Sequence, residues 1–286
     1  MKGTFMTDFS RFLIASDLDG TFLSKKGEVV QRNLDAIAHF NAHGGAFTLN
    51  TGRPHITIAP TTGAPAKICN APSSHCNGAY LYDFQTNEYF FEELLTEKDA
   101  ADLLDFARKL CADVAFRANA REQIRVFVPE GCAKPHVVGA DKGFVTFDTP
   151  VEEWAMSDWY KMVFVGDPAR IVQVRRDFER VFGERFGKTT SSARALEVQL
   201  PHSSKAAGLE KMRQLSPEMD ARTVIACGDF ENDIPMLKAA DIAICPANAM
   251  DEVKEVCDLV LCDCNEGLIA DIIENIETGK IRPKQK

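Results

Sequence analysis

The stretch FLIASDLDGT at residues 12–21 decides the fold, because an apolar run leads directly into two carboxylates and a glycine. Phe12 to Ala15 predicts a short strand that is buried on both faces. Asp17 and Asp19 follow one residue apart, so the turn of the loop can aim them at different groups, and Gly20 allows that turn to be sharp. Open α/β sheets bind ligands beyond the carboxyl ends of such strands. The stretch therefore predicts acidic chemistry at a strand exit.

The same alternation of strands and helices appears in both end regions of the chain. Leu34, Ile37 and Phe40 stand at helical spacing, and an apolar strand follows them. The predicted helices are Gln31 to His43, Asn232 to Ala240, Ala249 to Val256 and Leu268 to Ile276, and the predicted strands are Ala46 to Asn50, Thr223 to Cys227, Ile242 to Cys245 and Leu259 to Leu261. Continuous apolar strands between helices are typical of a parallel sheet covered on both faces. We therefore expect an α/β fold with a Rossmann-like core and a mainly parallel sheet.

The middle of the chain has a different, mixed α+β pattern. It predicts a hairpin over Tyr80 to Phe91, helices at Thr96 to Cys111 and Ala169 to Phe182, and strands at Ile124 to Val128 and Lys161 to Val165. A chain of 286 residues is long enough for two domains. We expect residues 1–83 and 193–286 to form one discontinuous catalytic core and residues 84–192 to form an inserted domain.

Three further polar segments follow predicted strands, as Asp17 does. The segment Thr51-Gly52-Arg53-Pro54 offers a hydroxyl and backbone N–H donors near an expected helix start, which suits a phosphate. Lys205 opens a helix predicted over Ser203 to Leu215, behind a strand at Leu196 to Leu200, and its charge could neutralise a phosphoryl group. The acidic segment Gly228 to Asp233 carries carboxylates of the kind that Mg²⁺ prefers.

Each segment alone also has an ordinary structural explanation. An Asp-x-Asp-Gly string can be a simple turn, Pro54 and Asn232 can belong to helix caps, and a single Lys is usually solvated surface. These explanations do not account for an acid pair, Thr51, Lys205 and Asp229 in this order, each next to a strand end. The constellation therefore favours phosphoryl chemistry.

The composition of the chain indicates which binding partners and which cell compartment to expect. The net charge of -9 disfavours attraction to nucleic acid or to an anionic membrane. No apolar run approaches the roughly 18 to 20 residues that span a bilayer, and Asp8 and Arg11 interrupt any signal peptide. Nine cysteines, an odd number, suit a reducing compartment, and the Cys-x-Cys pair at residues 262 and 264 lacks zinc spacing. We expect a cytoplasmic protein without nucleic-acid or membrane partners; the sequence carries no signal for its oligomeric state.

Together the four segments resemble the motifs of the haloacid dehalogenase superfamily, and within it the Cof-type phosphatases of subfamily IIB with a C2-type α/β cap. The segment Cys76 to Ala79 is similar to the one that leads into the cap, and Ala195 to Val198 with Ser204-Lys205 is similar to its exit. The resemblance covers the core, whereas the cap matches more in position than in sequence. Two departures are His202-Ser203, where a glycine-containing turn is expected, and extra length at Ala71 to His75.

The resemblance implies a Mg²⁺-dependent phosphatase of small phosphorylated metabolites, such as sugar phosphates, whose cap selects the leaving group. In such enzymes the residue at Asp17 attacks phosphorus and binds the metal, and the residue at Asp19 acts as acid and base and offers its backbone carbonyl to the metal. The residue at Asp229 binds the metal directly, and the one at Asp233 supports the metal site. The implied phosphate- and substrate-binding residues are Leu18, Thr51, Gly52, Lys205 and Asn232.

Two other functions stay open at this stage. A phosphomutase would share these motifs but would need a cap that excludes water and binds a bisphosphate, and Arg117, Arg121, Arg125 and Lys161 are cations that could line such a cap or be solvated surface. An inactive phospholigand-binding protein on the same fold would predict decayed motifs, and none has decayed. A nucleotide P-loop at Gly183 to Thr189 is not expected, because the segment follows a helix and is one residue short.

Overall fold

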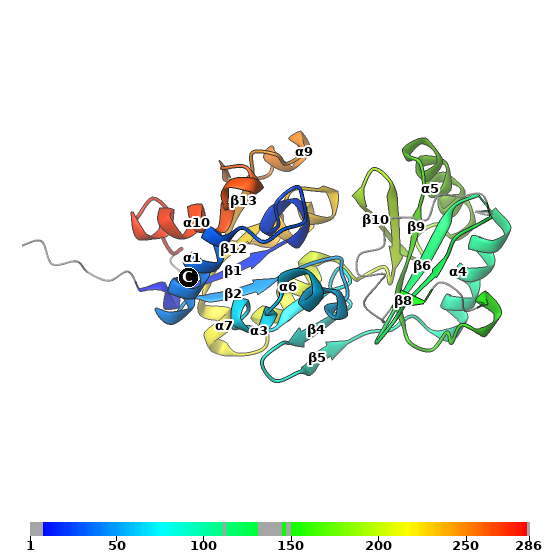
Figure 1. Cartoon of the computed structure of the whole chain (residues 1–286), viewed down its shortest axis with the longest axis horizontal. Coiled ribbons are helices and arrows are strands. Elements are labelled where there is room, and N and C mark those ends of the chain that lie inside the picture. Colours follow the sequence, from blue (N-terminus) through cyan, green and yellow to red (C-terminus); the bar gives the residue numbers. More distant parts are fainter. Residues whose placement is uncertain (1–7, 111–112, 131–144, 147–149, 285–286) are drawn as a thin grey trace, which may run out of the picture.

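The computed structural model describes residues 8–110, 113–130, 145–146 and 150–284. These residues form two lobes, a core built on a five-stranded sheet and a cap built on a six-stranded sheet, with a third sheet of three strands beside the core (Figure 1). In the described ranges, the helices are too short or too polar to cross a bilayer.

The core sheet is entirely parallel, as the apolar strands predict. Its order is β14 (Leu259–Leu261), β13 (Ile242–Pro246), β12 (Thr223–Cys227), β1 (Phe12–Ser16) and β2 (Ala46–Leu49). β1 therefore lies between two partners that come from distant parts of the sequence. The predicted strands agree with these bounds to within about one residue at each end.

Helices cover both faces of the core sheet. Phe12 and Ile14 of β1 pack toward α1 (Gln31–Ala42) and α10 (Leu268–Glu277), whereas Leu13 and Ala15 pack toward α6 (Lys205–Arg213) and α8 (Ile234–Ala239). Because successive strand residues point to opposite faces, two covered faces require an unbroken apolar strand. This is why all five residues of β1 are buried.

The remaining core elements are short connections at the ends of the strands. The helix predicted at Ala249 to Val256 is a single turn, α9. The short helices are η1 (Phe9–Arg11), η2 (Leu18–Phe22), η3 (His55–Thr57), α2 (Ile58–Thr62), α3 (Pro65–Ile68), α7 (Pro217–Ala221), η5 (Glu231–Asp233), α9 (Asp251–Lys254) and η6 (Cys264–Glu266).

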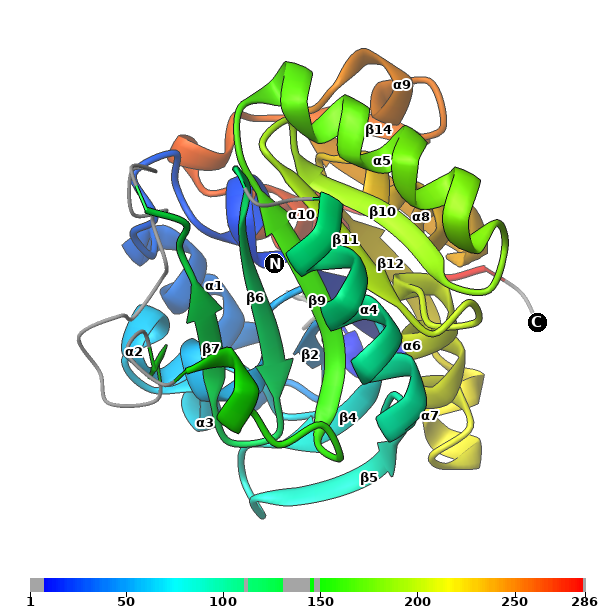
Figure 2. The same cartoon turned by 90° about the vertical axis from the view of Figure 1, so that its right-hand side faces the viewer.

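The described helices of the cap lie on the outer side of its sheet. Its order is β10 (Gly187–Ser192), β11 (Ala195–Gln199), β9 (Trp159–Val165), β6 (Ala115–Ala120), β7 (Ile124–Phe127) and β8 (Val145–Thr146), antiparallel except between β7 and β8. Helices α4 (Glu97–Leu110) and α5 (Pro168–Phe182) lie across one face, and η4 (Val151–Glu153) precedes β9 (Figure 2). The other face is turned toward the core. The predicted α/β core with an inserted α+β cap is confirmed.

β11 differs from the sequence-based expectation. Leu196 to Leu200 was expected to be a core strand, but β11 hydrogen-bonds to β9 and β10 inside the cap sheet. The physical reason is that Leu196 and Val198 pack into the apolar layer beneath the cap helices. The division of the chain into domains is still a prediction, and we propose that the return to the core comes after Gln199 and not near residue 193.

The third sheet joins the two lobes through a cluster of aromatic rings. It consists of β3 (Ser73–His75), β4 (Tyr80–Asp83) and β5 (Glu88–Glu92), all antiparallel, so the predicted hairpin at Tyr80 to Phe91 is observed. The extra length at Ala71 to His75 supplies the edge strand β3. Tyr80 stacks on His75 of the same sheet and on Tyr160 of the cap, with ring centroids 5.3 and 4.3 Å away.

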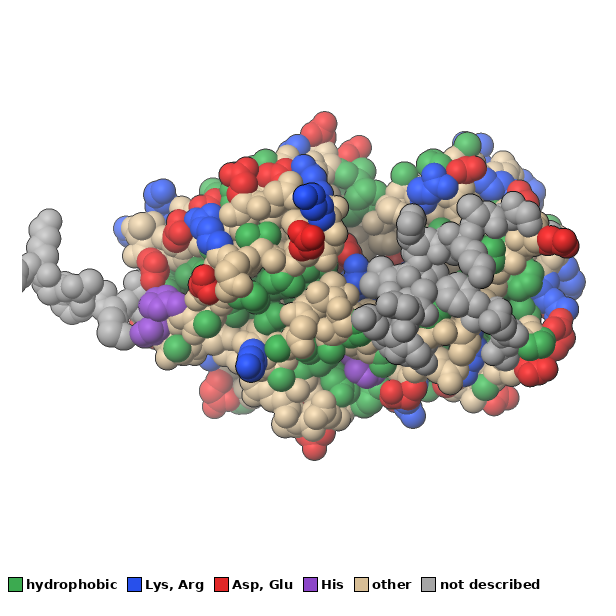
Figure 3. Space-filling model, in the orientation of Figure 1, with side chains coloured by type: hydrophobic (Ala, Val, Ile, Leu, Met, Phe, Trp, Pro, Cys, Tyr) green, Lys and Arg blue, Asp and Glu red, His purple; other side chains and the backbone are tan. Residues whose placement is uncertain are grey.

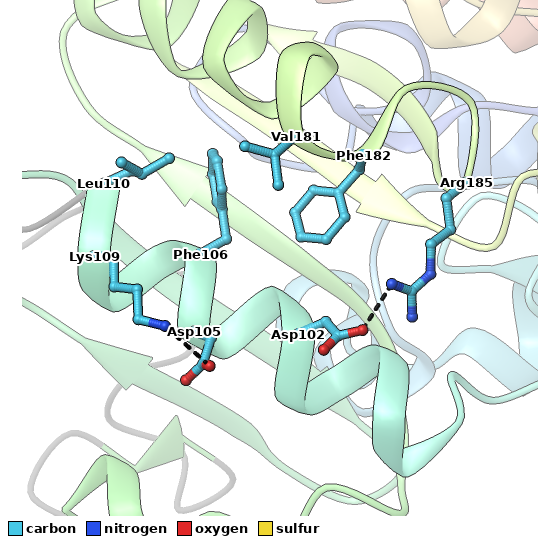
Figure 4. Close-up of a pocket in the computed structure, with 8 residues that line it drawn as sticks. All are labelled: Asp102, Asp105, Phe106, Lys109, Leu110, Val181, Phe182 and Arg185. Atoms are coloured by element: carbon cyan, nitrogen blue, oxygen red, sulfur yellow. Dashed lines mark hydrogen bonds and ion pairs between the residues drawn. The ribbon is translucent and has the colours of Figure 1, made fainter.

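The outer side of the cap carries a groove between α4 and α5 (Figure 4). Phe106, Leu110 and Phe182 form much of its apolar lining. The charged side chains around it are paired, Arg185 with Asp102 and Lys109 with Asp105. Because the cations that line this groove are already neutralised, it does not suit an anionic substrate.

Candidate active site

The polar residues singled out in the sequence meet at the carboxyl edge of the core sheet. Asp17 directly follows β1, Asp229 follows β12 and Thr51 follows β2, while Lys205 is the first residue of α6. Neighbouring parallel strands end at the same edge, so residues far apart in the chain come together there. A hollow between the two lobes is visible in the space-filling view (Figure 3).

Lys205 joins two buried carboxylates. Its Nζ donates to Oδ1 of Asp17 and to Oδ1 of Asp233, at 2.5 Å in both cases, and its side chain is fully buried. Ser204 caps α6 by accepting a hydrogen bond from the backbone N–H of Ala207 at 3.1 Å, which fixes the first turn of the helix. Burial acts to lower the pKa of Lys205, but the two carboxylates override it and raise the pKa, so the amine stays charged.

The three carboxylates of this edge differ in how their oxygens are used. Oδ2 of Asp233 accepts the backbone N–H groups of Asp229 and Phe230 at 2.9 and 3.0 Å, so both oxygens of Asp233 are engaged. Oδ1 of Asp229 accepts the Thr21 hydroxyl at 2.9 Å. Within the described ranges, Oδ2 of Asp17 and Oδ2 of Asp229 accept no hydrogen bond. Asp17 and Asp229 therefore present open oxygens, whereas Asp233 holds the loop in place.

Negative charge is in excess at this edge. Burial raises the pKa of Asp17 well above its ordinary value, and Asp233 and Asp229 add to the rise although Lys205 opposes it. Burial and Asp233 also raise the pKa of Asp229, to about 7. Crowded buried carboxylates are stable in their ionised form only when positive charge is close. One lysine is too little for three carboxylates.

The cluster fits a divalent cation with oxygen ligands. Ligand atoms of Asp17, Asp229 and Asp233 lie within 4.8 Å of one another. Gly20, with φ +75°, brings the backbone so close to Asp229 that a Cβ atom there would clash with the carboxylate. Hard cations such as Mg²⁺ take few protein carboxylates in this kind of setting. The chemistry and spacing of these donors therefore suit such an ion.

Asp19 stands apart from this cluster and is paired with Arg53. The side chain of Asp19 is 55% exposed and accepts from the guanidinium through both oxygens, with Arg53 Nε to Asp19 Oδ2 at 2.7 Å. Arg53 also donates to the Thr61 hydroxyl at 3.0 Å. Arg53 was not among the predicted site residues, although it follows Thr51-Gly52 at the same strand exit and could have been found there.

The Thr51-Gly52 turn contacts the cap. The Thr51 hydroxyl accepts the backbone N–H of Arg53 at 3.1 Å, and the Gly52 carbonyl accepts from Lys161 Nζ of β9 at 2.5 Å. The expected helix start is only partly present, because η3 and α2 are short. Leu18, the other residue expected to offer its backbone, is fully buried at the start of η2.

A buried polar network links Asn232 to the cap. Asn232 Nδ2 donates to Oδ1 of Asn77 at 3.3 Å, and Asn77 Nδ2 donates to Oε2 of Glu197 in β11 at 2.6 Å. Glu197 also accepts from Lys161 at 2.5 Å and from the Ser191 hydroxyl at 2.6 Å. Glu197 and Asn77 were not among the predicted site residues. A Glu and a Lys inside otherwise apolar strands were the available signal, since unpaired charge is costly to bury.

A buried acidic cluster at the carboxyl edge of a parallel sheet, facing an inserted cap, defines a class of hydrolases with a capped α/β core. The chain belongs to the haloacid dehalogenase-like hydrolase family, whose profile matches residues 14–273. The expectations of this family and of an enzyme are therefore confirmed.

Relatives and solved structures agree with this assignment. The chain is 24% identical to pyridoxal phosphate phosphatase YbhA of Escherichia coli, over 91% of this chain and 97% of that protein. It is 25% identical to the putative phosphatase YxeH of Bacillus subtilis, over 94% and 99%. A haloacid dehalogenase-like hydrolase from Bacteroides thetaiotaomicron superposes with a TM-score of 0.77 at 23% identity, over 92% and 98% of the two chains. The subclass IIB sugar phosphatase BT4131 gives 0.75 at 19% identity, over 94% and 99%.

Proposed function

We propose that this protein is a Mg²⁺-dependent phosphatase of small phosphorylated metabolites that works through an aspartyl-phosphate intermediate on Asp17. The observation that carries the proposal is the open Oδ2 of Asp17 beside Lys205 and Asp229, at the end of the buried strand β1. The family match and the phosphatase names of relatives such as YbhA support the same reaction.

The reaction proceeds in two displacements at phosphorus. The Asp17 carboxylate attacks the phosphorus of the ester, the bond to the leaving oxygen breaks, and Asp19 in its acid form gives that oxygen a proton. Asp19, now a carboxylate, takes a proton from water as the water attacks the phosphorus of the aspartyl phosphate. Inorganic phosphate leaves and Asp17 is regenerated. Both oxygens of Asp19 are engaged by Arg53, so the Asp19 side chain must leave Arg53 before it can carry a proton to the leaving oxygen.

The transferring phosphoryl group needs positive charge and N–H donors more than it needs covalent help. We assign Lys205, the Thr51 hydroxyl and the backbone N–H groups near Leu18 and Gly52 to its oxygens, and Asn232 to the substrate side of the site. Lys205 is already fixed by Asp17 and Asp233, so it is in position before the substrate arrives.

Asp17, Asp229 and the backbone carbonyl of Asp19 would hold Mg²⁺, with Asp233 fixing the loop behind them. When bound, the ion supplies positive charge for the phosphate oxygens and for the crowded carboxylates. Added Mg²⁺ should therefore raise the melting temperature of the native protein, because a ligand that binds only the folded state stabilises it. Asp229→Asn should remove most of that rise, as measured by thermal unfolding with Mg²⁺ or with EDTA.

The test of the reaction is phosphate release from a panel of phosphorylated metabolites, with and without Mg²⁺. Asp17→Asn should lose activity by about a thousandfold or more, since it removes the nucleophile. Asp251→Asn, at a carboxylate that is 94% exposed on α9, is the matched control and should stay active. Transfer of the phosphoryl group to an added sugar phosphate instead of to water would favour the phosphomutase. A folded native protein that binds phosphate esters and turns over none would favour the binding protein.

The cytoplasmic location also remains a prediction. All seven cysteines that lie in the described part of the chain are free thiols, which agrees with a reducing compartment. Cell fractionation would test it.

A further inference from the structure

The face of the cap sheet that is turned toward the core carries polar side chains from β6. Phe116 and Ala118 belong to the apolar layer beneath the cap helices. Because strand residues alternate between faces, Arg117 and Asn119 point to the opposite side, toward the core. They are therefore candidates for contact with the substrate.

The structure separates the four cap cations that the sequence left undecided. Arg121 is paired with Glu92, Arg125 with Asp158 and Lys161 with Glu197. Arg117 differs, because it makes no ion pair and no hydrogen bond with any residue of the described ranges, and its Nε is buried without a partner. A charged guanidinium with no counter-ion is costly to enclose.

Asn119 has unmet hydrogen-bonding groups at the same place. Its side chain is fully buried, and in the part of the chain that the structure describes neither Oδ1 nor Nδ2 makes a hydrogen bond of regular geometry, although the weakly polar Cys76 thiol lies close to the amide. A buried amide left unpaired destabilises a protein unless something else satisfies it. Arg117 and Asn119 therefore offer hydrogen-bond donors, and Asn119 also offers an acceptor, on the face of the cap sheet that is turned toward the core.

These two residues lie close to the part of the site that meets the leaving group. Burial lowers the pKa of Arg117. Three charged groups also act on this pKa, because Glu197 and Asp19 raise it and Arg53 lowers it, so all three lie within electrostatic range of the guanidinium. Asn119 is the strand partner of Lys161, which reaches the Gly52 carbonyl. Asp19 is the proposed proton donor to the leaving oxygen, so a leaving group attached to that oxygen would extend into the space between Asp19 and the cap face that carries Arg117.

We infer that Arg117 and Asn119 recognise the leaving group, and that the preferred substrates are phosphate monoesters whose alcohol carries a second anionic group, a carboxylate or another phosphate. The inference rests on the proposed phosphatase function. Lys161 is neutralised by Glu197 and Arg53 by Asp19, so among these three cations of the described ranges only Arg117 keeps a charge that is free for the substrate. A guanidinium fork suits carboxylate and phosphate oxygens, and the Asn119 amide suits a neighbouring hydroxyl.

The test compares esters that differ only in this group. Phosphoglycerate is paired with glycerol phosphate, and the terminal phosphate ester of gluconate with that of sorbitol, so that two lengths are covered. Sorbitol bisphosphate distinguishes a second phosphate from a carboxylate. For the native protein, kcat/KM for at least one anionic ester should exceed that of its neutral partner by about 10-fold or more, the size of a hydrogen bond to a charged group.

Substitutions then assign the preference to Arg117. Arg117→Gln should bring the ratio of kcat/KM between the two esters close to one, mainly through KM of the anionic ester. Arg117→Lys should keep an intermediate ratio, because it retains the charge and loses the fork. The matched control is Arg180→Gln on α5, whose side chain is 75% exposed and paired with Asp177, and it should leave the ratio at the native value.

The outcomes separate this inference from the function on which it rests. Equal rates for every pair in the native protein, or a preference that survives Arg117→Gln, would overturn the inference and leave the phosphatase intact. Absence of phosphate release from all of these esters and from p-nitrophenyl phosphate, with Mg²⁺ present, would overturn both.

Discussion

Gly20 is the residue at which backbone geometry and metal chemistry meet. Its positive φ is natural for glycine and strained for any other residue, and its Cα passes against the carboxylate of Asp229. Because Gly20 has no Cβ, the Asp229 side chain has room to lie beside Asp17. A change at Gly20 thus reaches the proposed metal ligands without removing any of them.

Gly20→Ala should lower both the free energy of unfolding and the affinity for Mg²⁺. Gly27→Ala is a matched control, because Gly27 has almost the same φ, +76°, but no atom lies within 4 Å of the position of the new Cβ. Both changes should cost about 1 to 2 kcal/mol for the left-handed backbone, and Gly20→Ala should cost more because its Cβ meets Asp229. Denaturant unfolding and Mg²⁺ titration check this, and equal effects of the two changes would contradict it.

The helices and strands that have a clear local hydrophobic pattern were predicted well from the sequence. The strands β1, β2 and β12 are continuous apolar runs, and α4 and α5 are long amphipathic helices, so their bounds agree closely with the predictions. β11 was placed in the wrong sheet because its alternation, with Leu196 and Val198 on one side, is equally compatible with either lobe. Sheet membership is a long-range property that periodicity does not carry.

The core residues of the candidate site were predicted from the sequence, whereas the cap residues beside them were not. Asp17, Thr51, Lys205 and Asp229 were predicted because each stands next to a strand end in a recognisable order, and the structure brings them to one edge of the core sheet. The Lys161–Glu197 pair and Arg117, which has no partner within the described ranges, come from cap strands whose neighbours in space cannot be known before the sheet is seen. Whether a charged residue of the cap has an ion-pair partner depends on contacts between residues that are distant in the sequence, and local patterns do not predict such contacts.

Two buried histidines, His55 of η3 and His75 of β3, should make the protein sensitive to mild acid. Burial lowers the pKa of His55 to about 4 and that of His75 to about 3, against 6.5 when unfolded. Below about pH 6.5 the histidines are protonated in the unfolded chain but stay neutral in the folded chain. The free energy of unfolding therefore decreases as the pH is lowered, by about 1.4 kcal/mol per pH unit for each histidine. The loss should run from about pH 6.5 down through pH 4.

Substitution of one ring tests the origin of this loss. His75→Gln should make the plot of unfolding free energy against pH shallower in that window, even if the overall stability drops. His43→Gln, at a surface histidine whose ring contacts the His39 carbonyl, is the control and should keep the native slope. A slope unchanged by His75→Gln would show that another group takes up the protons.

At the scale of the whole molecule, the two lobes are held together by buried polar contacts as well as by rings. Burial acts to raise the pKa of Glu197, but the charge of Lys161 overrides it, so this glutamate is ionised inside the protein. The pair touches the core through Gly52 and Asn77. At the edge of the interface, Arg175 and Thr190 of the cap also contact Glu231 of the core.

Lys161→Met should loosen the contact between cap and core, because it leaves a buried carboxylate unpaired, at a cost of about 3 to 5 kcal/mol. The double change Lys161→Met with Glu197→Gln should recover much of that stability, since no buried charge then remains. Lys109→Met, at a 72% exposed lysine paired within α4, is the control. Thermal unfolding and small-angle scattering would measure both effects, and a single variant as stable as the control would contradict the prediction.

The position of β1 between β2 and β12 also has a consequence for synthesis on the ribosome. β1 is completed early, but its partner β12 ends at Cys227, and Asp229 follows only then. Through translation of the whole cap, one edge of an apolar strand has no neighbour from its own chain, a state that favours chaperone binding or aggregation. The catalytic centre can therefore be assembled only after the whole cap has been synthesised.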